Sequence, residues 1–251
     1  MTKLFLHIGT HKTGTTAIQQ ALKQEYLTLL DEHIVWLNPP TCFRALQFAR
    51  KERQGVIENC REYLHKRVNK YPEHTLVMSF EGFSGDIMQG YRNAPIIAKS
   101  LKKITADFDV SVILYLRDRE QFVNSAYVQY IMQGQSWSFG QFLKRVGGNA
   151  FDWAKLTDAY RKNFGQVIVK KYEHARLNKV GGIVKEFATI IGSKTLVDVK
   201  SKIHNPSYNQ QAVEIALLCN QYLPAKQIKR FRALLQKALP KRPHNKFFFD
   251  K

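Results

Sequence analysis

The sequence is poor in cysteine and has no long apolar run. Its three cysteines, Cys42, Cys60 and Cys219, lie far apart and form no C-x-x-C pair. This spacing indicates neither a disulfide framework nor a zinc site, and free thiols are the ordinary state of such residues in a reducing compartment. No segment approaches the roughly 20 consecutive apolar residues that a membrane-spanning helix needs.

Signals for export are also missing. The first apolar run, Leu4 to Ile8, is too short and too interrupted for a signal peptide and is better interpreted as a buried strand. The one glycosylation-like triplet, Asn205-Pro206-Ser207, has proline in the position that prevents modification. No cluster of metal-ligand residues is visible. We therefore expect a soluble, cytoplasmic protein without a metal site.

Acidic residues are scarce relative to basic ones. The chain has 20 Asp and Glu against 39 Lys and Arg, for a formal net charge of +19. Such an excess favours anionic partners, namely nucleotides, acidic glycans, nucleic acid or an anionic membrane surface. The 251 residues, 44% of them hydrophobic, are enough for one substantial core. We expect a single domain over residues 1–251, with a helical, basic C-terminal part from about 205.

Strand-like and helix-like segments alternate along the chain. Strands are predicted at 4–8, 75–80, 110–116 and 166–170, and helices from Thr15 and at 43–68, 95–104, 119–132, 138–146, 152–163, 179–191, 209–222 and 225–238. Alternation of this kind is typical of α/β domains. It predicts a three-layer structure, in which helices cover both faces of a parallel sheet.

The most informative segment is Gly9-Thr10-His11-Lys12-Thr13-Gly14-Thr15-Thr16, which joins the first strand to the first helix. Glycines let a backbone curl so that several amides face one anion, and a helix N-terminus adds a positive dipole end. Lys12 contributes a full charge, and Thr15 and Thr16 contribute hydroxyl groups. Every part of this loop suits a phosphate.

The loop departs from the nucleotide-triphosphate motif G-x-x-x-x-G-K-[ST] in an informative way. Gly9 and Gly14 have the right separation and Thr16 fits the last position, but Thr15 stands where that motif has lysine. The lysine is instead Lys12, in the body of the loop, where it can reach the oxygen between a phosphate and a departing group. A P-loop kinase or NTPase stays open as an alternative, with Asp118 near the place of a magnesium ligand.

The stretch from His7 to Thr16 resembles the 5′-phosphosulfate loop of the PAPS-dependent sulfotransferases, bacterial members in particular. PAPS is 3′-phosphoadenosine 5′-phosphosulfate. The resemblance implies a P-loop NTPase-like fold, PAPS as nucleotide sulfate donor, 3′,5′-ADP (PAP) as product, and no metal. It implies that Lys12 contacts the 5′-phosphate and the transferring sulfate. The donor-binding residues would be Gly9, Thr10, His11, Lys12, Thr13, Gly14, Thr15 and Thr16.

A second phosphate-binding pair is predicted near the strand at 110–116. Arg117 follows that strand, and Ser125 stands eight residues further on, inside the next helix. A guanidinium binds phosphate oxygens in a bidentate fork, and a serine can add a hydroxyl donor. The resemblance implies that both residues bind the 3′-phosphate of the donor. The alternative is that Arg117 only pairs with Asp118 or Glu120 at the helix start.

Glu81 is the third candidate, because it comes directly after the strand at 75–80. Lys12, Glu81 and Arg117 therefore lie near the carboxyl ends of three predicted strands, the edge at which open parallel sheets bind ligands. By resemblance to the sulfotransferases that act on heparan sulfate, Glu81 would be the catalytic base. His11 is the rival base. The alternative for Glu81 is an ordinary glutamate at a loop start or a partner for Lys12.

Later segments resemble the bacterial enzymes more weakly. They are Asp152-Trp153, Tyr172-Glu173 and His204-Asn205-Pro206-Ser207. Trp153 and Tyr172 are residues of a type found more often in cores than stacked on adenine. No counterpart of the glycine-rich adenine loop of the animal cytosolic enzymes is found, so the sequence assigns no adenine contact.

The sequence thus predicts a sulfotransferase that moves the sulfuryl group of PAPS to a hydroxyl or an amine. A carbohydrate, acidic or neutral, is the favoured acceptor. A nucleic-acid-binding protein is a further alternative, because residues 225–251 hold nine Lys and Arg and one acid, Asp250, near Phe231 and Phe247-Phe248-Phe249. A solvated helix face with an apolar tail is the favoured interpretation of that stretch, and nucleic acid the disfavoured partner. Nothing in the sequence indicates an oligomeric state.

Overall fold

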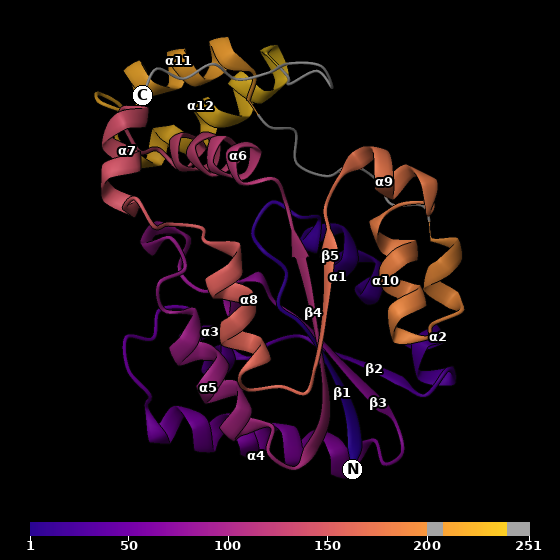
Figure 1. Ribbon diagram of the computed structural model, residues 1–251. Coiled ribbons are helices and arrows are strands. Elements are labelled where there is room, and N and C mark those ends of the chain that lie inside the picture. The colour runs from indigo at the N-terminus through magenta and orange to yellow at the C-terminus, as the bar shows by residue number, and fades with distance from the viewer. Residues whose placement is uncertain (200–207, 240–251) are drawn as a thin grey trace. The chain divides into compact units, whose positions relative to one another are not determined.

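The computed structural model describes residues 1–199 and 208–239 (Figure 1). These residues form two compact units. The first contains Met1–Asp118 and the described part of Asn149–Lys202, and the second contains Arg119–Gly148 and the described part of Ile203–Lys251. The single domain over residues 1–251 stays a prediction. Within the described ranges, no helix combines the length and the apolar character that crossing a bilayer requires.

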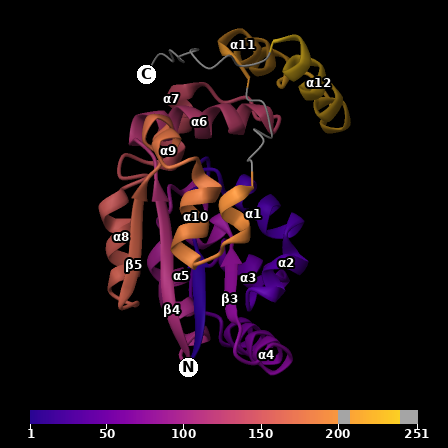
Figure 2. The same cartoon turned by 90° about the vertical axis from the view of Figure 1, so that its right-hand side faces the viewer.

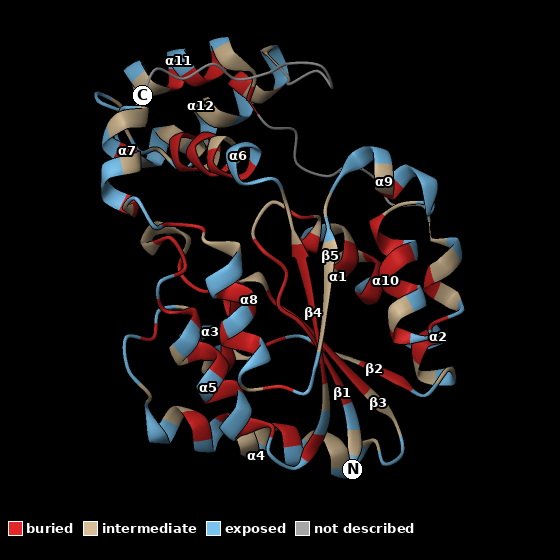
Figure 3. Cartoon of the chain, in the orientation of Figure 1, coloured by how far each residue is buried: buried red, intermediate tan, exposed pale blue. Residues whose placement is uncertain are grey.

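The first unit is built on one five-stranded parallel sheet, with the strand order β2-β3-β1-β4-β5. The strands are β1 (Thr2–His7), β2 (Ile34–Leu37), β3 (Thr75–Ser79), β4 (Phe108–Leu116) and β5 (Gln166–Lys171). The central strands are almost entirely buried, as continuous apolar runs in parallel sheets usually are (Figure 3). In the register of the sheet, His7 at the end of β1 lies opposite Ser79 of β3 and Ile113 of β4. The predicted α/β class with a parallel sheet is confirmed.

Helices cover both faces of this sheet (Figures 1 and 2). One face carries α1 (Thr15–Gln24), α2 (Tyr26–Asp31) and α10 (Ile183–Ile191), with the short helix η3 (Thr195–Asp198) beside α10. The other carries α3 (Thr41–Leu46), α4 (Gln54–Lys70), α5 (Ala94–Ile104) and α8 (Trp153–Arg161). The remaining elements of this unit are η1 (Glu81–Ser84), η2 (Ile87–Gln89) and α9 (His174–Lys179). Phe5 of β1 packs with Ile18, Leu22 and Phe187 in the core under α1 and α10.

The helix predicted over 43–68 is wrong as a single element, because the chain forms α3 and α4 with an irregular segment between them. The side-chain amide of Asn93 donates to the carbonyl oxygens of Gln47 at 2.8 Å and Ala49 at 3.1 Å. These contacts use backbone acceptors that a continuous helix would need for its own hydrogen bonds. The periodicity continued through the break, but a tertiary contact decided where the helix ends.

Two further differences arise near short elements. The helix predicted over 179–191 begins only at Ile183, as α10, because Gly181 and Gly182 before it have positive φ (82° and 104°), and the short helix α9 was not predicted. Strand β2 was not predicted, because its four residues are too few to show a period. Strand β2 nevertheless pairs in parallel with β3 and completes one edge of the sheet.

The second unit is helical. It contains α6 (Arg119–Met132), α7 (Phe139–Val146), α11 (Gln210–Cys219) and α12 (Ala225–Ala238). Asn220 joins the end of α11 to the end of α6 by donating to the carbonyl oxygens of Ile131 and Gln135, at 2.8 Å each. The predicted helical C-terminal part is confirmed within residues 208–239. The segments His204-Asn205-Pro206-Ser207 and Phe247-Phe248-Phe249-Asp250 lie outside the described residues.

Candidate functional site

The loop between β1 and α1 is closed by its own threonines. The backbone amide of Thr10 donates to Oγ1 of Thr13 at 3.2 Å, and that hydroxyl donates back to the carbonyl oxygen of Thr10 at 2.6 Å. The hydroxyl of Thr10 donates to the carbonyl oxygen of Tyr115 on β4, at 3.1 Å. Both threonine side chains are fully buried. The loop is therefore a compact turn that is attached to the neighbouring strand.

Three residues of the loop have left-handed backbone conformations. They are Gly9, Lys12 and Gly14, with φ values of 43°, 67° and 80°. A Cβ atom on Gly9 would lie only 2.6 Å from Oγ1 of Thr15, so this position needs glycine for space as well as for conformation. Lys12 adopts the left-handed conformation although it has a Cβ. Strained residues of this kind cluster at ligand-binding sites, where the surrounding structure holds them in place.

The N-terminus of α1 has donors without protein acceptors. Gly14 occupies the N-cap position and no side chain caps the helix. Within the described part of the chain, no hydrogen bond is made by the backbone amides of Gly14, Thr15 and Thr16, and the buried hydroxyl of Thr15 has no partner. Unpaired amides and the helix dipole together favour an anion. The residues present therefore fit a phosphate group.

The order of the strands places this loop at a topological switch point. After β1 the chain goes to β2 on one side of the sheet, and after β4 it goes to β5 on the other side. Ligands of open α/β sheets bind where two adjacent strands diverge in this way, beyond their carboxyl ends. Lys12 follows β1 and Arg117 follows β4, so both residues lie at this point. The sequence prediction that Lys12, Glu81 and Arg117 follow three strands is confirmed, and the strands β3, β1 and β4 are neighbours.

Arg117 is half-buried beside Tyr172. Burial lowers the pKa of Arg117, whereas the nearby Tyr172 and Asp118 raise it. The guanidinium keeps its charge at neutral pH, because its unperturbed pKa is above 12. A Cβ atom on Gly14 would lie 3.3 Å from Cε2 of Tyr172, so the tyrosine ring packs against the loop. The backbone oxygen of Arg117 also accepts a 2.8 Å hydrogen bond from the indole of Trp153.

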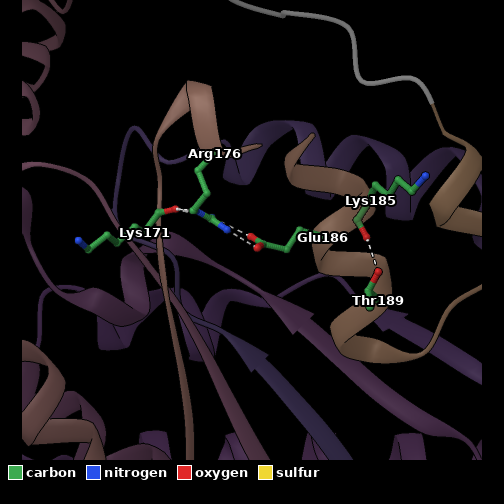
Figure 4. A network of polar contacts seen from close by, with 5 residues as sticks. All are labelled: Lys171, Arg176, Lys185, Glu186 and Thr189. Atoms are coloured by element: carbon green, nitrogen blue, oxygen red, sulfur yellow. Dashed lines mark hydrogen bonds and ion pairs between the residues drawn. The ribbon is translucent and has the colours of Figure 1, made fainter. Parts of the chain in front are cut away.

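Arg176 holds the turn that follows β5 (Figure 4). Nε of Arg176 donates to the carbonyl oxygen of Lys171 at 2.7 Å, and Nη1 forms a 2.5 Å ion pair with Glu186 of α10. Glu186 is buried, and its two oxygens face the two guanidinium nitrogens. A bidentate pair of this kind is geometrically specific. It fastens the end of β5 to the helix that packs on α1.

Glu81 begins η1, directly beyond β3. In the same short helix, the buried hydroxyl of Ser84 donates to the carbonyl oxygen of Ile8 at 2.9 Å and also bonds that of Gly9. Gln19 of α1 donates to Oε2 of Glu81 at 3.4 Å and to the carbonyl oxygen at the end of β3 at 2.9 Å. One short helix therefore carries the predicted base and anchors the start of the loop between β1 and α1.

Tyr91 is bonded to His11 and is affected by the charge of Glu81, and sequence reasoning missed it. Its hydroxyl accepts from the backbone amide of His11 at 3.1 Å and lies 2.7 Å from Nδ1 of the same residue. Burial raises the pKa of Tyr91, and the negative charge of Glu81 raises it further. No motif identifies this tyrosine, because it lies 80 residues from His11 in the chain.

The His11 side chain is neutral at physiological pH. Burial lowers its pKa to about 4, and the charge of Lys12 acts in the same direction. A neutral imidazole with so low a pKa accepts a proton weakly. The structure thus brings both predicted bases, Glu81 and His11, to the same edge of the sheet.

Ser125 lies half-exposed on α6, in the second unit. Its predicted pairing with Arg117 on a shared phosphate stays a prediction. The other predicted site residues all belong to the first unit: Gly9 to Thr16, Glu81 and Arg117.

His7 lies fully buried beneath the loop, and its titration predicts an acid-sensitive fold. Nδ1 of His7 is 2.7 Å from the hydroxyl of Ser79, and burial lowers the pKa of His7 to about 3. Below the unperturbed pKa of about 6.5 the unfolded chain binds a proton that the folded chain does not, so the folded state loses stability as the pH falls. This loss amounts to about 1.4 kcal/mol per pH unit.

A His7→Asn variant removes this titration. We expect the variant to be less stable than the original chain at pH 7, because a buried ring is lost. Its free energy of unfolding should fall less steeply between pH 6 and pH 4.5, by about 1 kcal/mol per pH unit. Urea unfolding at several pH values measures both slopes. Equal slopes for the two proteins would show that His7 does not stay neutral in the folded state.

No model of a known protein family matches this chain, and no curated protein sequence matches it. Function is therefore inferred from the chemistry of the site. That site combines the uncapped N-terminus of α1 and a lysine in the compact loop before it. An arginine follows the neighbouring strand β4, and a glutamate follows β3, the neighbour on the other side.

Proposed function

We propose that this chain is a sulfotransferase that uses PAPS as its donor and has a P-loop NTPase-like fold. The observation that carries the proposal is the uncapped N-terminus of α1, which is preceded by Lys12 and has Arg117 at the end of the adjacent strand. The amides suit a 5′-phosphate. Lys12 lies in the loop body, where it suits the oxygen that joins this phosphate to a sulfuryl group.

A second phosphate on the donor would give Arg117, at the end of β4, a role in binding. Adjacent strands are about 4.8 Å apart, so groups at the ends of β1 and β4 can bind one nucleotide through two phosphates. PAPS has such a pair, at its 5′ and 3′ positions. ATP lacks the 3′-phosphate, and Thr15 stands where a triphosphate loop has its lysine. The site therefore favours PAPS over a nucleoside triphosphate.

The reaction follows from the positions of these groups. An acceptor hydroxyl or amine attacks the sulfur atom, and the bond between sulfur and the bridging oxygen breaks. 3′,5′-ADP leaves with the bonding electron pair, and the acceptor's proton passes to Glu81, or to His11 in its place. Lys12 and the amides at the start of α1 stabilise the charge that grows on the bridging oxygen. A carbohydrate is the acceptor class that we propose.

Nucleotide binding tests this proposal without knowledge of the acceptor. At equal concentration, a ligand that binds the folded protein more tightly raises the melting temperature more, so 3′,5′-ADP should stabilise the protein more than 5′-AMP or ATP with Mg²⁺. Arg117→Ala should remove most of the advantage of 3′,5′-ADP over 5′-AMP, about 10- to 100-fold in Kd, because a charged hydrogen bond to phosphate is lost. Arg161→Ala, an exposed arginine at the end of α8, should leave the order unchanged.

Other outcomes point elsewhere. Stronger stabilisation by ATP with Mg²⁺ would support a kinase or NTPase. Binding of oligonucleotides in preference to all three nucleotides, with a steep dependence on salt, would support a nucleic-acid-binding protein. Either result would contradict the proposal.

A further inference from the structure

Gln19 of α1 contacts both Glu81 and the strand end that precedes it. The side-chain amide of Gln19 donates to Oε2 of Glu81 at 3.4 Å and to the carbonyl oxygen of Ser79, the last residue of β3, at 2.9 Å. Only Phe80 separates Ser79 from Glu81 in the chain. One amide group therefore joins the end of β3 to the side chain that stands just beyond it.

The two acceptors fix the direction in which the Gln19 amide faces. A backbone carbonyl oxygen and an ionised carboxylate oxygen can only accept hydrogen bonds, and the amide nitrogen of glutamine carries one proton for each of them. The reversed orientation would place the amide oxygen of Gln19 against two acceptors, so the hydrogen-bond network assigns the nitrogen to this side. Both donors of Gln19 are in use.

The place of Gln19 on α1 connects Glu81 with the start of the helix. Gln19 comes four residues after Thr15 and three after Thr16, so it lies on the same side of α1, one turn further along. Within the part of the chain that the structure describes, the backbone amides of Thr15 and Thr16 make no hydrogen bond. The first turn of α1 therefore offers donors to an anion, and its second turn holds Glu81.

The contact makes the two carboxylate oxygens of Glu81 unequal. Oε2 accepts from Gln19, whereas Oε1 accepts from no side chain or backbone amide among the described residues. Glu81 is only half-buried, and a glutamate side chain loses considerable rotamer freedom when it is held in place. A hydrogen bond to one oxygen fixes where the other points, and reaction rates depend strongly on such positioning.

We propose that Gln19 is the positioning residue of the base: it holds Oε2 of Glu81, so that Oε1 receives the proton of the attacking hydroxyl or amine. This inference rests on the proposed sulfotransferase function for its chemical step. Gln19 acts through Glu81 in this role and needs no contact with the donor or the acceptor. Its removal should therefore affect turnover and leave nucleotide binding intact.

The experiment compares two glutamine-to-methionine variants of α1. Methionine keeps the length of the side chain and a high helix propensity but has no amide donor. Gln19→Met removes the contact with Glu81, and Gln24→Met makes the same change at the exposed last residue of α1 and is the control. Initial rates of 3′,5′-ADP release at varied PAPS, with partly desulfated heparin as acceptor, give kcat and KM. Titration with 3′,5′-ADP gives Kd, and melting curves check that each variant is folded.

We expect Gln19→Met to lower kcat about tenfold and to change the KM for PAPS and the Kd for 3′,5′-ADP by less than about twofold. Gln24→Met should have normal constants. The double variant Gln19→Met/Glu81→Gln should be no slower than Glu81→Gln alone, because residues that act through one group do not have additive effects.

Three results would overturn the inference. Normal turnover by Gln19→Met would show that Glu81 needs no positioning. Equal falls in kcat and in the affinity for 3′,5′-ADP would show that Gln19 shapes the loop before α1 instead of the base. Losses that multiply in the double variant would show that Gln19 acts independently of Glu81.

Nuclear magnetic resonance tests the contact without turnover. Gln19→Met identifies the side-chain amide signals of Gln19 by removing them, and these signals should shift in Glu81→Ala but not in Glu58→Ala, an exposed position on α4. No shift in Glu81→Ala would overturn the inference. If the signals shift but the original chain releases no 3′,5′-ADP from PAPS, the sulfotransferase proposal fails and the hold of Gln19 on Glu81 stands. If the original chain turns over and Gln19→Met does so at the normal rate, the positioning role fails and the proposed function stands.

Discussion

Lys12→Ala is expected to lower kcat for the release of 3′,5′-ADP from PAPS by about 10²–10³-fold, the usual effect of removing one group that stabilises transition-state charge. Lys12 is in the body of the phosphate loop, between the end of β1 and the start of α1. Its charge matters most when the bridging oxygen becomes negative, so the affinity for 3′,5′-ADP should fall by a smaller factor than kcat. The assay follows 3′,5′-ADP with partly desulfated heparin as acceptor.

The left-handed conformation of Lys12 offers an internal control. Alanine keeps a Cβ atom at a φ of 67°, whereas Lys12→Gly relieves a cost of about 1–2 kcal/mol. Lys12→Gly should therefore be as inactive as Lys12→Ala and more stable to urea. Lys23→Ala, at the far end of α1, should keep full activity. If the affinity for 3′,5′-ADP fell while kcat stayed unchanged, Lys12 would bind the nucleotide without assisting the chemical step.

Glu81→Gln is expected to lower kcat by about 10²–10⁴-fold, the range for loss of a general base. Glutamine keeps the shape of the side chain but cannot accept the acceptor's proton. The KM for PAPS should change little, because the phosphate loop is held by Ser84 and by its own threonines. Initial rates of 3′,5′-ADP release at varied PAPS give both constants.

His11→Gln separates the two candidate bases. We expect a smaller loss of kcat than for Glu81→Gln, because Nδ1 of His11 is already hydrogen-bonded to the hydroxyl of Tyr91. Glu58→Gln, an exposed glutamate on α4, is the matched control and should have normal activity. A larger loss from His11→Gln than from Glu81→Gln would assign the base to His11 instead. Normal turnover by Glu81→Gln would remove Glu81 from the mechanism.

The parts of the fold that the sequence predicted well are governed by local interactions. The bounds of α6 match the prediction over 119–132, because its apolar residues recur at helical spacing. The loop from Gly9 to Thr16 was also identified from local features of the sequence. Its two glycines permit conformations that other residues disfavour, and both are left-handed in the structure. Signals of this kind need no distant partner.

The predictions of helices and strands failed where residues far away in the chain decide the local structure. The break between α3 and α4 depends on Asn93, whose amide takes two backbone oxygens more than 40 residues earlier in the chain. Strand β2 is stabilised by pairing with β3, and its four residues alone carry no period. Periodicity reports on a segment's own burial and not on such long-range hydrogen bonds.

By itself, the sequence determined that this chain is an α/β protein with a glycine-containing loop between its first strand and first helix, since glycine conformation and strand and helix periods are local properties. Only the tertiary structure decided that Tyr91 would bond to His11, and that Arg44 of α3 would lie over the ring of Phe80, the residue before Glu81. The physical reason is that these neighbours meet through the order of the strands and the packing of helices on the sheet. Contacts between residues so far apart in the chain leave no pattern in the sequence of either partner.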